Sequence, residues 1–307
     1  MNSTTGYRKG SKPRADIYAA ATDRIIAALE QGAAPWVRPW TATGSGMPRN
    51  GSTGRNYNGV NVLLLCAEAH AKGYESGEWL TYRQAKALGG NVRKGERGTG
   101  IVFWKFLERS GTDDNGDETT RKIPMARAYT VFNREQCDGL PEPKEAPKVA
   151  TLSEAERHAQ AERFIAATRA DVRHGGSRAF YSPKLDYIQL PRFETFRDGA
   201  SYYATACHEL THWTGNAGRC ERDFESRFGS QAYAAEELVA ELGAAFLCAE
   251  LGIDGKLQHP EYIKSWLKVL RGDKRAIFTA ASKARQAAEY LKTAAGWEAQ
   301  EREEVAA

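Results

Sequence analysis

The stretch CHELTHWTG, residues 207–215, constrains this chain more than any other part of its sequence. It contains His208-Glu209-x-x-His212, and residues four apart on a helix lie on one face, about a turn from each other. Both imidazoles can therefore reach one zinc ion at roughly 2.0–2.1 Å, with Glu209 beside it as a general acid and base. The alternative is a chance pattern, because five residues are few. The apolar SYYATAC before it and the strand-like LDYIQL upstream favour a metal centre.

The third ligand must come from elsewhere in the chain. The metzincin pattern HExxHxxGxxH fails here, because Gly218 stands where its last histidine is needed. A downstream helical segment, AAEELVAELGAAFL, offers Glu237 and Glu241, which share a helix face, beside Glu236. Its apolar neighbours indicate a largely buried helix, in which carboxylates need partners. By resemblance to gluzincins, Glu237 is the preferred ligand and Glu241 supports a histidine; the reverse assignment stays open.

The charge of the chain is unevenly distributed. The 307 residues carry a formal net charge of +4, but residues 1–140 hold 20 Lys and Arg against 14 Asp and Glu. Much of that acid lies in ERSGTDDNGDE, residues 108–118, which is typical of a solvated loop. A basic first half beside a mildly acidic second half suggests two modules with different partners, the first attracting a polyanion.

The pattern of apolar and turn residues predicts an α+β protein of two domains. We expect a mixed α/β domain over residues 1–140, a proline-rich charged linker over 141–152, and a mostly helical domain with a small sheet over 153–307. A strand over 101–106 should pair with one in 126–136, and a hairpin or edge strand should occupy 180–192. Helices are expected within 14–31 and over 60–71, 153–173, 201–213, 233–251, 260–270 and 279–293, with Ser153 and Glu156 forming a capping box, and residues 79–88 should be a turn leading into a short helix.

Neither a membrane span nor a secretory signal is expected. The longest apolar run is far too short to cross a bilayer, and no apolar stretch follows the basic N-terminus. The five cysteines form no C-x-x-C pair, which favours reduced thiols in a cytoplasm. We therefore expect a cytoplasmic protein without a membrane partner.

The first half combines aromatic rings with basic residues. Single-stranded nucleic acid is held by a positive groove and by rings on which bases stack. A lone tryptophan is more often part of a core, but Trp36 and Trp40 flank Arg38 in a loop and are better candidates for stacking. The segment GGNVRKGERGTG adds backbone amides and basic side chains suited to phosphates. The nucleic-acid-binding candidates are Trp36, Arg38, Trp40, Arg49, Asn50, Arg55, Tyr57, Asn61, Trp79, Gln84, Arg93, Lys94 and Arg97.

Several spaced motifs together resemble one family. PWVRPW, Pro48-x-Asn50, YNGVNVLLL, WLTYRQA, GGNVRKGERGTGIVFW and YTVFNREQCDGLP are similar to the N-terminal domain of ArdC-type antirestriction proteins, which TraC-type plasmid primases share. YSPKLDYIQLP, CHELTHWTG and YAAEELVAELGAAFLCAELGI resemble the zincin-like metallopeptidase domain that follows it in ArdC proteins. The resemblance covers roughly residues 14–295.

The resemblance implies a protein of a conjugative plasmid or another mobile element that binds single-stranded DNA and protects incoming DNA from restriction. It also implies a gluzincin-type zincin-like domain holding a divalent metal ion, zinc or alternatively manganese. It leaves open whether the centre is an active zinc-dependent metallopeptidase that cleaves DNA-associated or restriction-modification proteins.

Overall fold

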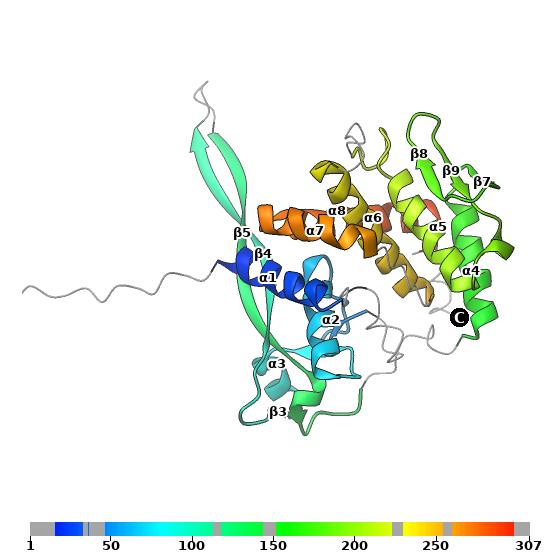
Figure 1. Cartoon of the computed structure of the whole chain (residues 1–307). Coiled ribbons are helices and arrows are strands. Elements are labelled where there is room, and N and C mark those ends of the chain that lie inside the picture. The colour runs from blue at the N-terminus through cyan, green and yellow to red at the C-terminus, as the bar shows by residue number, and fades with distance from the viewer. Residues whose placement is uncertain are drawn as a thin grey trace, which may run out of the picture.

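The computed structural model gives the arrangement of both halves (Figure 1). It describes residues 16–32, 36, 47–112, 118–143, 152–222, 230–253 and 260–297, with the side chains of 104–112, 118–124, 260 and 261 excepted. The predicted α+β class with two domains is confirmed. Among these residues, no helix is both long enough and apolar enough to cross a membrane.

The first half is a small sheet flanked by short helices. Its helices are α1 (Ile17–Glu30), α2 (Val60–Lys72) and α3 (Tyr82–Ala87). A four-stranded sheet has the order β1-β2-β5-β4, and a second sheet pairs β3 with β6. The strands are β1 (Arg49–Asn50), β2 (Glu78–Leu80), β3 (Asn91–Val92), β4 (Thr99–Thr112), β5 (Glu118–Asn133) and β6 (Cys137–Asp138), with the short 3-10 helix η1 (Arg134–Gln136) before β6.

The hairpin of β4 and β5 is longer than the sequence predicts. The two strands pair antiparallel from Thr99 opposite Val131 to Thr112 opposite Glu118, and they extend away from the rest of the molecule (Figure 1). The prediction of a loop over 108–118 is therefore wrong at both ends, because charged and small residues continue the strands. Charge marks solvent exposure, and a two-stranded ribbon has exposed faces where such residues are tolerated.

The second half is mostly helical. Its helices are α4 (Glu154–Ala167), α5 (Gly199–Trp213), α6 (Gln231–Leu251), α7 (Pro260–Gly272) and α8 (Ala276–Ala294). A three-stranded sheet has the order β7-β9-β8, from β7 (Val172–His174), β8 (Phe180–Ser182) and β9 (Tyr187–Leu190), and the 3-10 helix η3 (Phe193–Thr195) follows it. The predicted hairpin over 180–192 is confirmed, with β8 antiparallel to β9.

The helix predicted over 153–173 begins correctly and ends early. Ser153 and Glu156 form the expected capping box at the start of α4. The helix ends at Ala167, however, because Thr168 caps it and Arg169 adopts a left-handed conformation with φ 60°. The residues expected to continue the helix form β7 instead, which adds to β9 in parallel.

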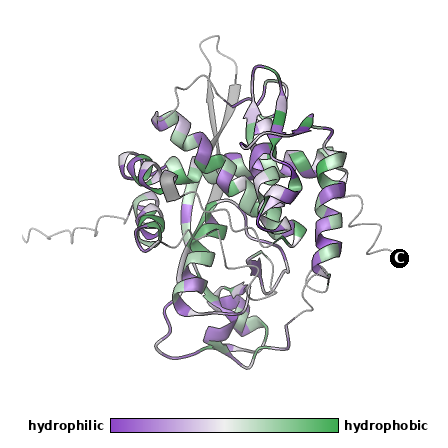
Figure 2. Ribbon diagram, turned by 45° about the vertical axis from the view of Figure 1, so that its right-hand side comes forward, coloured by the Kyte–Doolittle hydropathy of each residue, from purple (hydrophilic) through white to green (hydrophobic). Residues whose placement is uncertain are grey.

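The two halves share one hydrophobic core. Tyr18 of α1 packs edge-on against Phe278 of α8, with ring centroids 4.9 Å apart, and Trp36 packs against Trp266 of α7 at 5.8 Å. The buried Thr22 hydroxyl donates to the backbone carbonyl of Lys274 at 2.7 Å. In Figure 2 many of the apolar turns lie on the helices toward the centre of the molecule. The two halves therefore pack against each other through buried side chains.

Candidate metal centre and nucleic-acid groove

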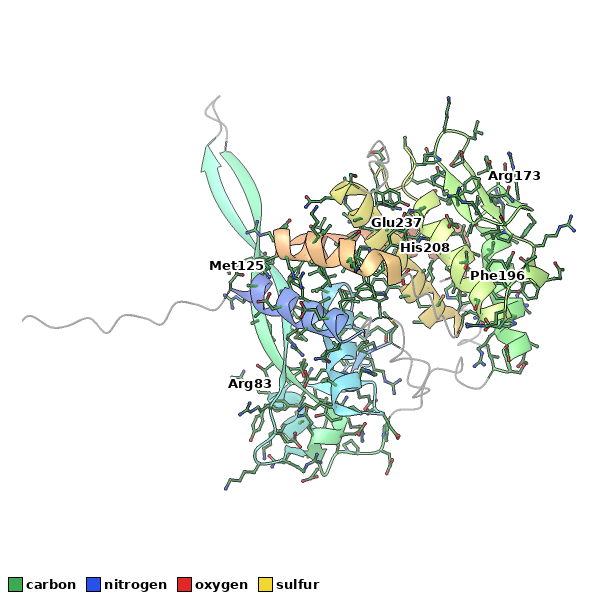
Figure 3. The ribbon with its side chains drawn as sticks, in the orientation of Figure 1. Arg83, Met125, Arg173, Phe196, His208 and Glu237 are labelled. Atoms are coloured by element: carbon green, nitrogen blue, oxygen red, sulfur yellow. The ribbon has the colours of Figure 1, made fainter. Side chains whose placement is uncertain are left out.

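Two helices of the second half bring the predicted metal ligands together. Helix α5 starts at Asp198, whose carboxylate accepts the Ser201 amide at 2.7 Å. Helix α6 crosses it closely at Gly243, because a Cβ there would come within 2.6 Å of the Thr211 hydroxyl oxygen. Figure 3 shows His208 on α5 beside Glu237 on α6.

The donor atoms have the spacing of metal ligands. His208 Nε2 lies 3.5 Å from Glu237 Oε2, and His212 Nε2 lies 3.6 Å from Glu237 Oε1. These distances are longer than ordinary hydrogen bonds of about 2.7–3.2 Å. Tetrahedral ligands about 2.0–2.1 Å from one zinc ion are roughly 3.3 Å apart. One donor from each of the three residues lies within 4.8 Å of the others, and all three side chains are buried. The donor set therefore fits a divalent cation.

A buried chain of polar side chains orients His212. Its Nδ1 contacts Glu236 Oε1 at 3.1 Å, which leaves Nε2 toward Glu237. The Arg222 guanidinium in turn bonds both Glu236 carboxylate oxygens and donates to the Thr214 hydroxyl at 2.8 Å. Partners of this kind fix the ring orientation of a metal-binding histidine.

Glu241 lies on the other side of His208. Its Oε2 is 3.6 Å from His208 Nδ1, the ring nitrogen that faces away from Glu237. Glu237 alone of the two lies close to the Nε2 atoms of both histidines. The geometry therefore favours Glu237 as the third ligand and Glu241 as a support for His208.

The electrostatics of the centre also favour a cation. Burial lowers the pKa of His208, but Glu237 and Glu241 outweigh it and raise that pKa to about 10. Burial likewise lowers the pKa of His212, which Glu236 and Glu237 raise to about 9. The pKa of Glu237 falls despite burial, because both imidazoles face it. Glu236, Glu237 and Glu241 thus place negative charge around both imidazoles, and such a buried field favours a cation.

Glu209 and two tyrosines complete the centre. Glu209 is 6% exposed and lies beside His208 along α5. Tyr233 approaches Glu237, and its hydroxyl is 3.4 Å from that of Tyr262. Burial, followed by these two partners, raises the pKa of Tyr233, so its hydroxyl stays protonated and can donate. The chain thus offers a carboxylate base and a neutral phenol donor around one cation site.

A groove in the first half gathers five of the nucleic-acid-binding candidates. Its volume is about 730 Å³, and its walls are the segment 50–61, α3, the first residues of β4, the end of β5 and one face of α8. The candidates that line it are Asn50, Arg55, Tyr57, Asn61 and Gln84. Asn61 is largely structural, because its amide exchanges two hydrogen bonds of 2.8 Å with the backbone of Val102.

Two tryptophans predicted to bind bases lie in the core instead. Trp36 and Trp79 are each 1% exposed, so neither ring has a free face for a base. Trp36 packs against Trp266, a contact from the other half that local sequence does not contain. The stacking role expected for them is therefore corrected to a packing role. Arg38 and Trp40 lie outside the described residues.

The remaining basic candidates lie apart from the groove lining. Arg49 is paired with the buried Glu78 at 3.1 Å, and Arg93 is paired with Glu96 at 2.9 Å. Lys94 and Arg97 are exposed on the turn after β3. Phosphate contacts by these residues stay a prediction.

Phe103, Arg285 and Arg222 are not among the candidates predicted from the sequence, whereas Tyr129 is one of the aromatic rings noted in its first half. Phe103 and Tyr129 are 55% and 46% exposed and face each other edge-on at 5.6 Å on the hairpin, beside the groove. Alternation along β4 could have placed Phe103 on the face opposite the buried Val102. Arg285 reaches the groove from α8, far away in sequence. Arg222 lies ten residues after His212, and no motif in the sequence links it to the metal centre.

Comparison with known proteins identifies both halves. Residues 15–132 match the family model of the N-terminal domain of anti-restriction factor ArdC, and residues 159–283 match that of a zincin-like metallopeptidase. The crystal structure of antirestriction protein ArdC from plasmid R388 in its metal-free form has a TM-score of 0.75 and 45% identity, covering 92% of this chain and 98% of that one. Its Mn(II)-bound structure gives 0.75 and 44%, covering 91% and 98%.

Two further relatives are similar to most of this chain. The chain is 48% identical over 284 residues to the uncharacterized protein y4eC of Sinorhizobium fredii, covering 90% of this chain and 91% of that protein. It is 44% identical over 287 residues to a DNA primase TraC of Escherichia coli, covering 88% of this chain but 26% of the primase. The fold and centre define a two-domain protein with a zincin-like second half. Specifically, the chain belongs to the family of ArdC antirestriction proteins.

Proposed function

We propose that this protein binds single-stranded DNA of a mobile element as it enters a new cell and protects that DNA from restriction in the cytoplasm. The observation that carries the proposal is the groove of the first half. It combines exposed rings, paired amides and arginine side chains, which are the groups that bind unstacked nucleotides. The similarity to antirestriction protein ArdC and to DNA primase TraC supports it.

We propose domain boundaries at 1–140 and 153–307 with a linker over 141–152. The two family matches fall on either side of that linker, which supports this division. The contacts of α1 with α7 and α8 imply that the domains act as one body despite it.

We propose His208, His212 and Glu237 as the ligands of a divalent metal ion, zinc or manganese. Support comes from the donor spacing, the buried carboxylates around both imidazoles and the Mn(II)-bound structure of the ArdC relative. Such an ion would act as a Lewis acid on water or a carbonyl group. Glu209 would accept and return a proton, Glu236 and Glu241 would hold the imidazoles in place, and Tyr233 would donate a hydrogen bond.

The DNA-binding proposal is tested by fluorescence anisotropy of a labelled oligo(dT) strand titrated with the whole protein. We expect binding that prefers the single strand over a duplex of equal length. The logarithm of the affinity should fall linearly with the logarithm of salt concentration, because each phosphate contact releases counterions. Binding that ignores salt, or that prefers duplex, contradicts the proposal.

A second candidate function is proteolysis of DNA-associated or restriction-modification proteins. It is favoured by the buried Glu209 on the same helix as both imidazoles, where a peptidase needs a base. Glu209→Gln should keep the bound metal and the affinity for DNA while abolishing any cleavage. If that variant protects transferred DNA in a restricting host as well as the wild type does, proteolysis is not the protective step.

A further inference from the structure

The groove that we propose for DNA has a wall that belongs to the other half of the chain. Phe278, Ser282 and Arg285 of α8 line it together with the segment 50–61 and the hairpin. We propose that the groove is a pocket for one unstacked nucleotide, built jointly by both halves, in which α8 contributes a phosphate contact. This inference rests on the proposed single-stranded DNA binding and names the site where it occurs.

The hairpin supplies the surface for a base. Phe103 of β4 and Tyr129 of β5 lie on neighbouring strands, and about half of each ring is exposed to solvent. Exposed rings lose contact with water when a base stacks on them, and a base that has left its own stack regains a partner. A groove of about 730 Å³ lies within the usual range of about 300–1,000 Å³ for small-ligand sites, so a nucleotide fits.

The floor of the groove carries a rigid pair of amides. Gln84 Nε2 donates to Asn50 Oδ1 at 3.2 Å, and Asn50 Nδ2 donates to Gln84 Oε1 at 3.3 Å. Asn50 Oδ1 also accepts the amides of Ser52 and Thr53, and Gln84 Oε1 accepts the Thr81 amide at 2.9 Å, so both side chains are held. Side-chain amides are suited to the hydrogen-bonding edges of bases.

Cationic groups stand on both walls. Arg55 is exposed on the segment 50–61, and across the groove Arg285 is partly exposed on α8. Arg285 is paired with Glu289 at 2.7 Å, but this pair is open to solvent, with side-chain exposures of 38% and 50%. An exposed ion pair is weak, so a phosphate can take the place of Glu289.

Two neighbouring hollows offer the backbone of a DNA strand a route past Arg285. A second hollow of about 190 Å³ shares Arg285 and the segment 56–59 with the groove and continues along α8 to Lys292. Arg285 therefore lies where the two hollows meet, the position from which one guanidinium can hold the phosphate between a bound nucleotide and the next. Because α8 packs on α6, the helix of Glu237, the proposed pocket adjoins the scaffold of the metal centre.

The test uses the full chain and three variants of α8, which should lower, raise or leave unchanged the affinity for DNA. Affinity for fluorescent oligo(dT) should fall about ten-fold in Arg285→Ala and rise in Glu289→Gln, which removes the competing carboxylate. Lys283→Ala removes the same charge from an exposed position of α8 outside the groove lining and should leave affinity unchanged. Thermal unfolding of each variant checks that its fold is intact.

A second readout locates the base. Phe103→Ala should weaken binding about ten-fold or more, whereas Phe193→Ala, which removes a ring of 44% exposure from the other half, should not. Photocrosslinking of an iododeoxyuridine oligonucleotide should label peptides containing Phe103 or Tyr129. If the wild type binds but Arg285→Ala and Phe103→Ala bind equally well, the shared pocket is wrong and DNA binding stands. If the wild type fails to bind, both proposals are overturned.

Discussion

At the residue scale, the chemistry of this protein depends on side chains whose partners lie far away in sequence. Glu237 is four residues from Glu241 on the same helix, yet only the fold separates their roles, because each faces a different nitrogen of His208. Arg222 shows the same dependence. Its fork spans Glu236, Thr214 and the Thr211 carbonyl, and its side chain is 2% exposed.

Replacing Arg222 by lysine should therefore destabilise the protein although the charge is kept. A lysine ammonium cannot match the planar fork, so one or more buried partners lose a hydrogen bond, at about 1–3 kcal/mol. Arg163→Lys is the matched control, because Arg163 is exposed on α4 and its replacement should change stability by at most about 0.5 kcal/mol. Urea unfolding measures both, and equal effects would remove the argument for a rigid Arg222.

At this scale, side chains that come together within one helix are predictable from the sequence. His208, Glu209 and His212 lie on one helix, so their spacing alone placed them together. Trp36 and Trp79 were misjudged, because burial depends on contacts between distant segments. A tryptophan beside arginines has the same local sequence whether it faces a base or a core.

At the element scale, the metal centre depends on how closely α5 and α6 approach. Gly243 sits in that contact against the fully buried Thr211, whose hydroxyl is held by the Cys207 carbonyl at 2.8 Å. The two helices were predictable from their apolar periodicity. Their crossing point was not predictable. A glycine within a helix can occur for several reasons, and a close contact with another helix is only one of them. Strand β7 was missed for a similar reason, since only pairing with β9 makes it a strand.

Gly243→Ala should push the two helices apart. The added methyl group would lie 2.5 Å from Thr211 Cγ2, and overpacking of this kind costs about 1–3 kcal/mol, more than alanine gains as a helix former. Gly272→Ala at the end of α7, where a Cβ meets nothing within 4 Å, is the control and should not lower stability. Thermal unfolding decides the matter, and a Gly243→Ala protein as stable as wild type would show that the crossing is loose.

The start of α5 should make stability depend on pH. Hydrogen bonds from Ser201 lower the pKa of Asp198 from 3.8 to about 2, so the folded state favours the ionised carboxylate. Its contribution is therefore complete above about pH 4 and is lost as the pH falls toward 2. Asp198→Ala should cost about 1 kcal/mol near neutral pH, and the gap should shrink below pH 4. Asp198→Asn, a neutral cap, should follow the wild type at acid pH. A gap that stays constant would contradict this role.

At the scale of the whole molecule, the two halves share one hydrophobic core, and we expect them to unfold together. The charge pattern and the proline-rich stretch predicted two modules, and two family models match them. What the sequence could not reveal is that α1 packs on α7 and α8. That contact requires complementary surfaces, which have no signature in either segment alone.

Trp266→Ala tests this continuity. The ring is 2% exposed and packs against Trp36 from the first half and Tyr262 beside it. Its loss should cost about 3–5 kcal/mol and should lower the stability of both halves together. Hydrogen exchange followed by mass spectrometry reports each half separately. If the first half keeps its protection while the second half loses it, the halves fold independently.

Above all, we propose that the second half holds a divalent cation between α5 and α6. The most direct measurement is the metal content of the purified chain after loading with zinc or manganese, beside His212→Ala, Glu237→Ala and Glu241→Gln. We expect about one ion per chain in the wild type, none in the first two variants, and weaker but detectable binding in Glu241→Gln. A wild type that retains no ion, or an ion that survives Glu237→Ala, would contradict the centre described here.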